Sequence, residues 1–110
     1  SRKLAKIHFR NGFQEKIVES NTLNSILKGS RFKNKRIDFL NIDVEGNELN
    51  VLKSLNFKKY KPKLICIEIH NHEDMYNQKT NYLKRNSIYK FLKTKKYKVY
   101  WKNGFSYIFR

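Results

Sequence analysis

The chain has one cysteine and one proline among its 110 residues, and none of its apolar runs is long enough to cross a membrane. Because Cys66 is alone, it can form neither an internal disulfide nor a cysteine metal site. We therefore expect a reducing compartment, the cytoplasm, and a thiol buried as a small apolar group. A membrane span needs about 18 apolar residues, so we expect a soluble protein with no membrane partner.

Acidic residues are also scarce. The 9 Asp and Glu residues are outnumbered by 25 Lys and Arg, for a net charge of +16. Such an excess favours an anionic partner such as nucleic acid. The cations are nevertheless spread along the chain, with short clusters only at residues 33–36, 58–63 and 93–98, and lysine, asparagine and isoleucine are abundant together, as in AT-rich coding. We favour biased composition over dedicated nucleic-acid binding, which stays an open alternative.

Glycine is rare as well, at four residues, and none of them forms a Gly-x-Gly pattern after a strand. The sequence therefore lacks the glycine-rich loop that holds the cofactor in many α/β folds. Apolar residues, in contrast, make up 39% of the chain and aromatic residues 15%, which argues against disorder. A chain of this length buries roughly 60 to 70% of its unfolded surface, enough for one modest core.

Local patterns predict a hairpin and a capped helix at the start of the chain. Residues 4–9 alternate between apolar and polar types, as a strand does, and the Asn11-Gly12 turn leads to a second short strand near residues 16–19. Ser20 or Asn21 is expected to cap the short helix that follows.

The centre of the chain predicts two buried strands joined by a helix. Residues 37–44 are mostly apolar, which is typical of a parallel strand buried on both faces. A helix should run from Gly46 or Asn47 to about Leu55, and residues 63–70 read as a second central strand. Such a βαβ unit is right-handed in nearly every known case.

Polar side chains follow both of these strands. Asp43 and Glu45 come at the end of the first, and Glu68 and His70 at the end of the second. Because ligands bind outside the carboxyl ends of parallel strands, we expect these groups to converge on one edge of the sheet. Glu48, in the first helical turn, is better explained by the positive end of the helix dipole.

The last third of the chain predicts a loop, a helix and a hairpin. Residues 71–86 are polar and read as a long loop over the site edge, partly helical, and Ser87 is expected to cap a helix. Strands at residues 97–101 and 105–109 flank the turn at Asn103-Gly104. Three aromatic residues of this hairpin could stack on nucleic-acid bases, although core or edge packing is the more frequent use of such a stripe: Tyr97, Tyr100 and Trp101.

The residues around the first central strand resemble a known family. The match runs through Ile37, Asp38, Phe39, Leu40, Ile42, Asp43, Val44, Glu45, Gly46, Glu48, Val51 and Leu52. Other segments fall in the same family's order, upstream at residues 22–27 and downstream at residues 61–63, 67–70, 88–92, 97 and 107–109. On these residues the chain resembles the FkbM-type methyltransferases, which use S-adenosylmethionine.

The resemblance implies an α/β fold with a partial doubly wound, Rossmann-like sheet of the class I methyltransferase kind, mostly parallel with a C-terminal antiparallel hairpin. In the family's seven-stranded sheet, residues 37–43 would be the fourth strand and 64–70 the fifth, with 97–102 and 105–109 as the sixth and seventh. We expect residues 1–110 to be one domain, the C-terminal portion of an FkbM-type methyltransferase domain without the N-terminal glycine-rich, cofactor-binding strands.

The resemblance also implies an activity. A methyl group would pass from S-adenosylmethionine to an oxygen, and the expected partner is a small-molecule or glycan acceptor with a free hydroxyl. Because most of the cofactor site is missing from the sequence, methyltransferase is expected as the function of the gene more than as an activity of the isolated chain.

Residue roles follow from the same resemblance. Asp43 would lie beside the cofactor's methyl group, where it would orient the acceptor hydroxyl or take its proton, and the alternative is that it caps the next turn. Glu45, Glu68 and His70 are supporting catalytic candidates. Glu45 could equally be the N-cap of the following helix, and His70 a polar strand end in water.

Two other functions stay open on the residues alone. A basic, non-catalytic module would bind nucleic acid or another anionic partner. Metal-assisted hydrolysis would need a divalent ion held by Asp43, Glu68, His70 and His72, a set of ligands whose convergence the sequence does not reveal, and we rank it below the methyltransferase.

Overall fold

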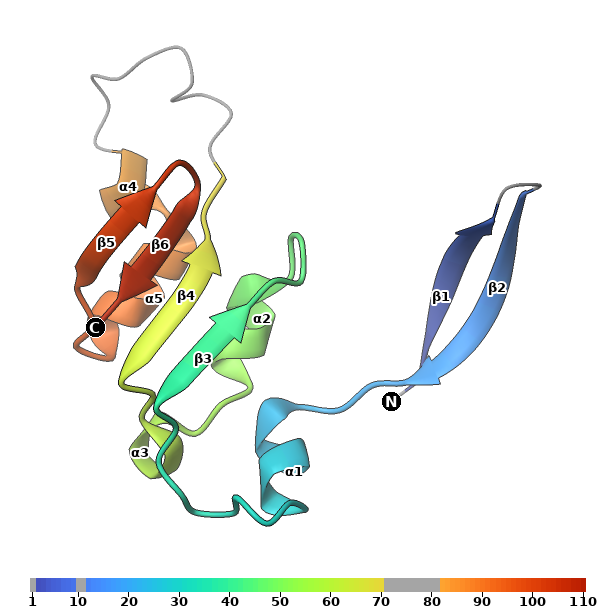
Figure 1. Cartoon of the computed structure of the whole chain (residues 1–110), viewed down its shortest axis with the longest axis horizontal. Coiled ribbons are helices and arrows are strands. Elements are labelled where there is room, and N and C mark those ends of the chain that lie inside the picture. Colours follow the sequence, from blue (N-terminus) through green and yellow to red (C-terminus); the bar gives the residue numbers. More distant parts are fainter. Residues whose placement is uncertain (1, 10–11, 71–81) are drawn as a thin grey trace.

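The computed structural model describes residues 2–9, 12–70 and 82–110. Eleven elements lie in these ranges (Figure 1): β1 (Arg2–Phe9), β2 (Gly12–Glu19), α1 (Leu23–Lys28), β3 (Phe39–Ile42), α2 (Glu48–Lys53), α3 (Phe57–Tyr60), β4 (Leu64–Glu68), α4 (Tyr82–Arg85), α5 (Ser87–Thr94), β5 (Val99–Asn103) and β6 (Ser106–Phe109). None of the described helices is long and apolar enough to span a membrane.

β1 and β2 form the antiparallel hairpin that the sequence predicts. β2 starts earlier than expected, because the pairing continues to its first residue, where Phe9 lies opposite Gly12. The turn residue Asn11 falls outside the described residues.

The main sheet has four strands in the order β3-β4-β6-β5 (Figure 1). β3 and β4 are parallel, whereas β6 pairs antiparallel with both β4 and β5. Three strands therefore run in one direction and β6 alone is reversed. The expectation of a mostly parallel sheet is wrong for the strand pairs, because the returning strand of the hairpin inserts between β4 and β5.

Helices cover one face of this sheet. α2 and α5 lie behind it in Figure 1, and side chains alternate between buried and half-buried along β4 and β6. The largest fully buried apolar side chains come from these helices and from the strands and their ends: Leu52, Ile65, Ile67, Ile69, Leu92 and Phe109.

The opposite face of the sheet is uncovered among the described residues. Phe39 is 53% exposed, Asn41 is exposed, and Cys66 is half-buried. Among the described residues the predicted first central strand is therefore buried on one face and not on both, and the prediction of a buried thiol is wrong. β3 is an edge strand here and has a helical layer on one side only.

Side-chain caps fix where two of the helices start. Thr22 caps α1 and Asn86 caps α5, each through a side-chain oxygen that accepts amide N–H groups from the first turn. These residues replace Ser20 or Asn21 and Ser87, which the sequence pattern had suggested. The physical reason is distance along the chain, because the side chain of an N-cap residue accepts from amides two or three residues further on.

α3 is a one-turn helix that sequence reasoning missed. The side-chain oxygen of Asn56 accepts the N–H groups of Lys58 and Lys59 at 3.0 and 3.2 Å. Phe57 and Tyr60 point into the core and are buried. An asparagine before an apolar residue was the available signal.

Candidate methyl-transfer site

The loop between β3 and α2 makes a sharp turn. Glu45 has φ of 33° and Gly46 has φ of 85°, so two successive residues adopt the left-handed region. Only glycine does so without steric cost, and Glu45 is held there against its preference. Asn47, not Glu45, is the N-cap of α2, which overturns the capping alternative for Glu45.

Glu48 is the buried acid of this loop. Its side chain is 8% exposed, and Oε1 accepts the N–H of Gly46 at 3.1 Å. It also lies in the first turn of α2, where the helix dipole favours a negative charge. The structure therefore supports the structural reading of Glu48.

Asp43 and Glu68 lie at the same level on adjacent strands. The parallel register pairs Ile42 with Ile67, so each acid is the next residue of its strand. Neighbouring strands are about 4.8 Å apart. Because side chains alternate, Asp43 shares the uncovered face of the sheet with Asn41.

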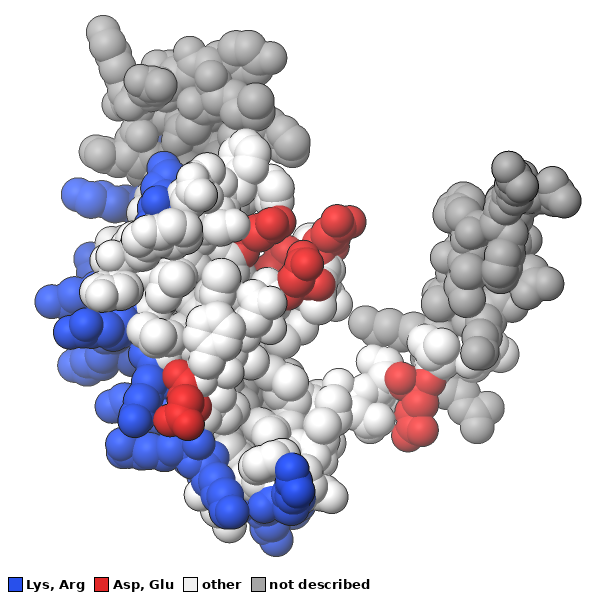
Figure 2. Space-filling model, in the orientation of Figure 1, with Lys and Arg blue, Asp and Glu red and all other residues white. Residues whose placement is uncertain are grey.

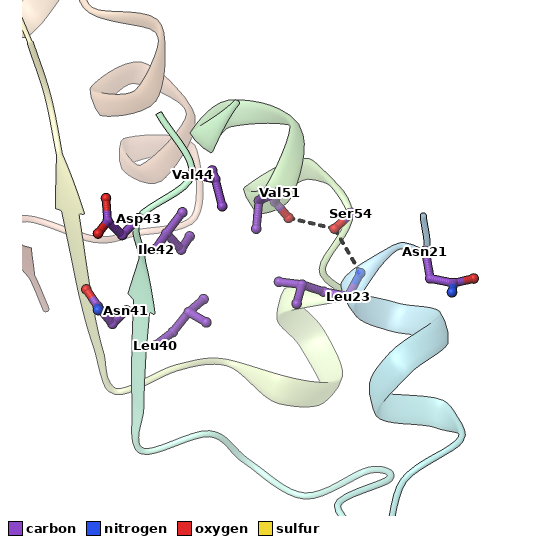
Figure 3. Close-up of a pocket in the computed structure, with 9 residues that line it drawn as sticks. All are labelled: Asn21, Leu23, Leu40, Asn41, Ile42, Asp43, Val44, Val51 and Ser54. Atoms are coloured by element: carbon purple, nitrogen blue, oxygen red, sulfur yellow. Dashed lines mark hydrogen bonds between the residues drawn. The ribbon is translucent and has the colours of Figure 1, made fainter. Parts of the chain in front are cut away.

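Figure 3 shows this separation of faces. Asn41 and Asp43 point to one side of β3, and Leu40 and Ile42 to the other. The Asp43 carboxylate is exposed, and no described residue donates a hydrogen bond to it. A capping role for Asp43 therefore has no hydrogen bond to support it.

His70 is tied to Glu68. Its Nε2 atom lies 2.9 Å from Oε2 of Glu68, and both side chains are about half exposed. The ring of Phe105 packs against the imidazole with 4.7 Å between centroids. The Ile69 N–H also donates to the Phe105 carbonyl at 2.9 Å, so the β5–β6 turn is fastened to the end of β4.

Phe105 was absent from the predicted site. Sequence reasoning identified its turn but not its neighbour. The signal becomes readable only once β6 is known to pair antiparallel with β4, because that pairing brings the turn to the carboxyl end of β4.

A cavity of about 400 Å³ lies beside β3 (Figure 3). Leu23 of α1 and Val51 of α2 form its apolar wall, and Ser54 ties these two elements together. The Ser54 hydroxyl accepts the Leu23 N–H at 3.1 Å and donates to the Val51 carbonyl at 2.7 Å. Asp43 and Val44 are its lining residues at the carboxyl end of β3.

Charge is segregated around this site. Figure 2 shows acidic side chains gathered at the carboxyl ends of β3 and β4, while Lys and Arg line the α5–β5 side and the α3 end. No group of three or more His, Cys, Asp or Glu in the described part of the chain is placed to hold a metal ion. His72, the fourth ligand of the predicted metal set, lies outside the described residues.

The three aromatic residues of the C-terminal hairpin differ in their burial. Tyr97 is 6% exposed and packs in the core, so a base-stacking role for it is wrong. Tyr100 and Trp101 are exposed, and the guanidinium of Arg110 lies 5.0 Å from the Tyr100 ring centroid.

Comparison with known protein families settles the kind of protein. The model of the methyltransferase FkbM domain matches residues 1–99, nearly the whole chain. This chain belongs to the FkbM methyltransferase family. Neither a curated protein nor a solved structure shows a significant match.

Membership of the FkbM family confirms the resemblance first noted around residues 37–52. It supports methyltransferase activity at the level of the family. The roles of Asp43, Glu45, Glu68 and His70 are not tested by it and stay predictions. Their positions are what the structure adds: Asp43 and Glu68 are level, Glu68 and His70 are in contact, and Glu45 lies in the turn.

Proposed function

We propose that this FkbM-family chain supplies the acceptor side of an S-adenosylmethionine-dependent O-methyltransferase, whose acceptor is a hydroxyl of a sugar or another small metabolite. The observation that carries the proposal is the level position of Asp43 and Glu68 at the carboxyl ends of two parallel strands. Ligands of open α/β sheets bind at that edge.

In this proposal Asp43 acts on the acceptor. It accepts a hydrogen bond from the acceptor hydroxyl and takes its proton as the new carbon–oxygen bond forms. Its carboxylate is exposed and without a described hydrogen-bond donor, so it is available for this contact. S-adenosylmethionine would supply the methyl group and keep the sulfur as its thioether product, and water would later take the proton from Asp43.

Glu68 and His70 support the acceptor in this arrangement. Oε2 of Glu68 lies 2.9 Å from Nε2 of His70, and this contact holds the imidazole ring beside the end of the strand. An imidazole so held can bind a second acceptor oxygen through a hydrogen bond. Glu45 makes no contact with the acceptor in this proposal. Its backbone contributes to the sharp turn that follows Asp43.

The described residues fit one end of S-adenosylmethionine. When bound, the cofactor supplies a methyl group on a positively charged sulfur, already activated for transfer to oxygen. A carboxylate at the end of β3 suits that positive charge, whereas the cavity beside Val44 lies on the other side of the strand and has no part in this contact. The described residues hold no glycine-rich loop for the rest of the cofactor.

The doubly wound architecture is part of the same proposal. A second helical layer would lie on the uncovered face, over exposed Phe39 and half-buried Leu64 and Cys66. The parallel β3–β4 pair joined through α2 supports it, since such units build doubly wound sheets.

Transfer of label from S-adenosylmethionine carrying a radioactive methyl group tests the proposal. The full-length gene product that contains this sequence would be incubated with mixed small-molecule and glycan hydroxyl acceptors. We expect a labelled product that survives mild base, as a methyl ether does. A product that releases labelled methanol would place the methyl group on a carboxylate and contradict hydroxyl transfer.

A further inference from the structure

Two adjoining hollows lie away from the acidic strand ends. The larger, about 710 Å³, is formed between α3 and the end of α5, and the smaller, about 590 Å³, adjoins it because Lys96 and Tyr97 line both. We call them together the cationic cleft. Seven cations line it: Arg36, Lys58, Lys61, Lys93, Lys95, Lys96 and Lys98.

The charge of the cationic cleft is not neutralised by the described part of the chain. No acidic residue is among its lining residues, and none of its cations forms an ion pair with a described carboxylate. Lys63 nearby does, at 3.5 Å from Asp38. Like charges gathered around two neighbouring hollows raise the local potential and attract an anion.

The floor of the larger hollow is aromatic and buried. Phe57 and Tyr97 are buried and meet edge to face with 6.0 Å between centroids. The Lys95 ammonium lies 5.7 Å from the Phe57 centroid and 5.5 Å from that of Phe91, so the rings hold this charge above the floor. Tyr97 donates to the Pro62 carbonyl at 2.5 Å, which joins the start of β5 to the loop before β4.

We propose that the cationic cleft binds the phosphate backbone of a single-stranded nucleic acid without reading its sequence. The floor rings are buried under lysines, so they offer no platform on which bases stack. A flexible strand can bring successive phosphates into a hollow, whereas a planar bilayer meets only its rim. A single phosphate would leave most of the seven cations without a counter-ion.

The site goes beyond the proposed methyl transfer and is tested without it. Fluorescence anisotropy would follow binding of a labelled oligothymidine of roughly 12 nucleotides across a range of salt concentrations. The cleft variant carries Lys58→Gln, Lys95→Gln and Lys96→Gln. A matched variant carries Lys28→Gln, Lys53→Gln and Lys84→Gln, which remove the same charge from exposed helix ends outside the cleft.

Selective weakening in the cleft variant is the expected result. Its dissociation constant should rise about tenfold or more, and the slope of log affinity against log salt should shrink by about 2, since each of the three lost phosphate contacts removes about 0.7 of a unit on a single strand. The matched variant should change about twofold at most. An equal loss in both variants would overturn the proposal in favour of unspecific attraction by net charge.

Two further measurements guard against a misfolded variant and another partner. In NMR spectra of the wild-type chain, the changes in amide chemical shift caused by the oligonucleotide should concentrate near residues 58–61 and 93–98. Changes spread evenly over all lysines would overturn the site. Vesicles of phosphatidylserine and phosphatidylcholine should bind more weakly than the oligonucleotide. Tighter vesicle binding, lost in the cleft variant, would reassign the cleft to a membrane surface.

Discussion

The Nε2 atom of His70 lies 2.9 Å from Oε2 of Glu68, one residue past the level of the paired strands β3 and β4. This contact makes a hydrogen-bonded acid–imidazole pair out of two side chains that the sequence only placed on one strand. The pair stands on the same edge of the sheet as Asp43, and Phe105 packs on its imidazole.

Neutralising Glu68 should therefore reduce methyl transfer. The Glu68→Gln variant keeps the size of the side chain but loses the charge that orients the imidazole. We expect the rate to fall about tenfold, which is less than the roughly 100-fold that loss of an acid–base group itself costs, because Glu68 acts through His70. Glu19→Gln, at the end of β2, is the matched control and should keep the wild-type rate.

Tyr97 should make stability depend on pH in the alkaline range. Burial raises the pKa of Tyr97 from 10.0 to about 12. The folded state thus holds the proton more tightly than the unfolded chain, so the stabilisation is complete below pH 10 and is lost as pH rises towards 12. A shift of this size corresponds to about 2 to 3 kcal/mol of unfolding free energy.

Urea unfolding of wild type and Tyr97→Phe between pH 9 and pH 12 measures this loss. Lysine titration affects both proteins alike, so their difference isolates Tyr97. The variant should start lower by about 1 kcal/mol, because the Pro62 carbonyl loses its donor, and then decline less steeply. Tyr100→Phe, with a side chain that is 62% exposed, should follow the wild-type curve. Parallel curves for Tyr97→Phe and wild type would contradict the account.

Gly46 is needed for backbone geometry. Its φ is 85°, and a Cβ added there would meet no atom within 4 Å, so the cost of Gly46→Ala is conformational only. We expect a loss of about 1 to 2 kcal/mol in unfolding free energy. Gly29→Ala is the matched change, because Gly29 has φ of −86° and its nearest atom would be 3.6 Å from the new Cβ. Equal losses at both glycines would argue against the left-handed turn.

Glu48 should matter for stability more than its neighbour Glu45. Glu48→Ala removes the acceptor of the Gly46 N–H and a charge at the start of α2, which we expect to cost about 1 to 3 kcal/mol. Glu45→Ala changes an exposed side chain and should alter the unfolding free energy by less than about 0.5 kcal/mol. Thermal melts of both variants decide the point, and a reversed order would contradict the structural role of Glu48 in this loop.

Local patterns carried much of the fold. Alternation and an Asn-Gly turn were enough for β1 with β2 and for β5 with β6, because both signals act over a few residues. The pairing of β6 with β4 could not be read in the same way. A hairpin turn indicates that β5 and β6 pair with each other. Which of the two also pairs with β4 depends on packing with residues about forty positions away.

The candidate site, too, has parts that local sequence signals predict and parts that depend on long-range packing. Asp43, Glu68 and His70 were identified because polar groups at strand ends stand out against apolar runs. The face on which Asp43 lies, and the contact of His70 with Phe105, depend on register and sheet order. The capping alternative for Glu45 is wrong, because an acid near a helix start fits that role by type, whereas the left-handed turn moves the cap to Asn47.

The most direct test of the methyl-transfer proposal is the rate at which S-adenosylhomocysteine forms, because this product appears whatever the acceptor. The full-length gene product would be compared with Asp43→Asn and with Asp38→Asn, an exposed acid of the same type outside the site, paired with Lys63. We predict a loss of about 100-fold or more for Asp43→Asn and none for Asp38→Asn. A wild-type rate in folded Asp43→Asn would contradict the assignment of Asp43 and the site built around it.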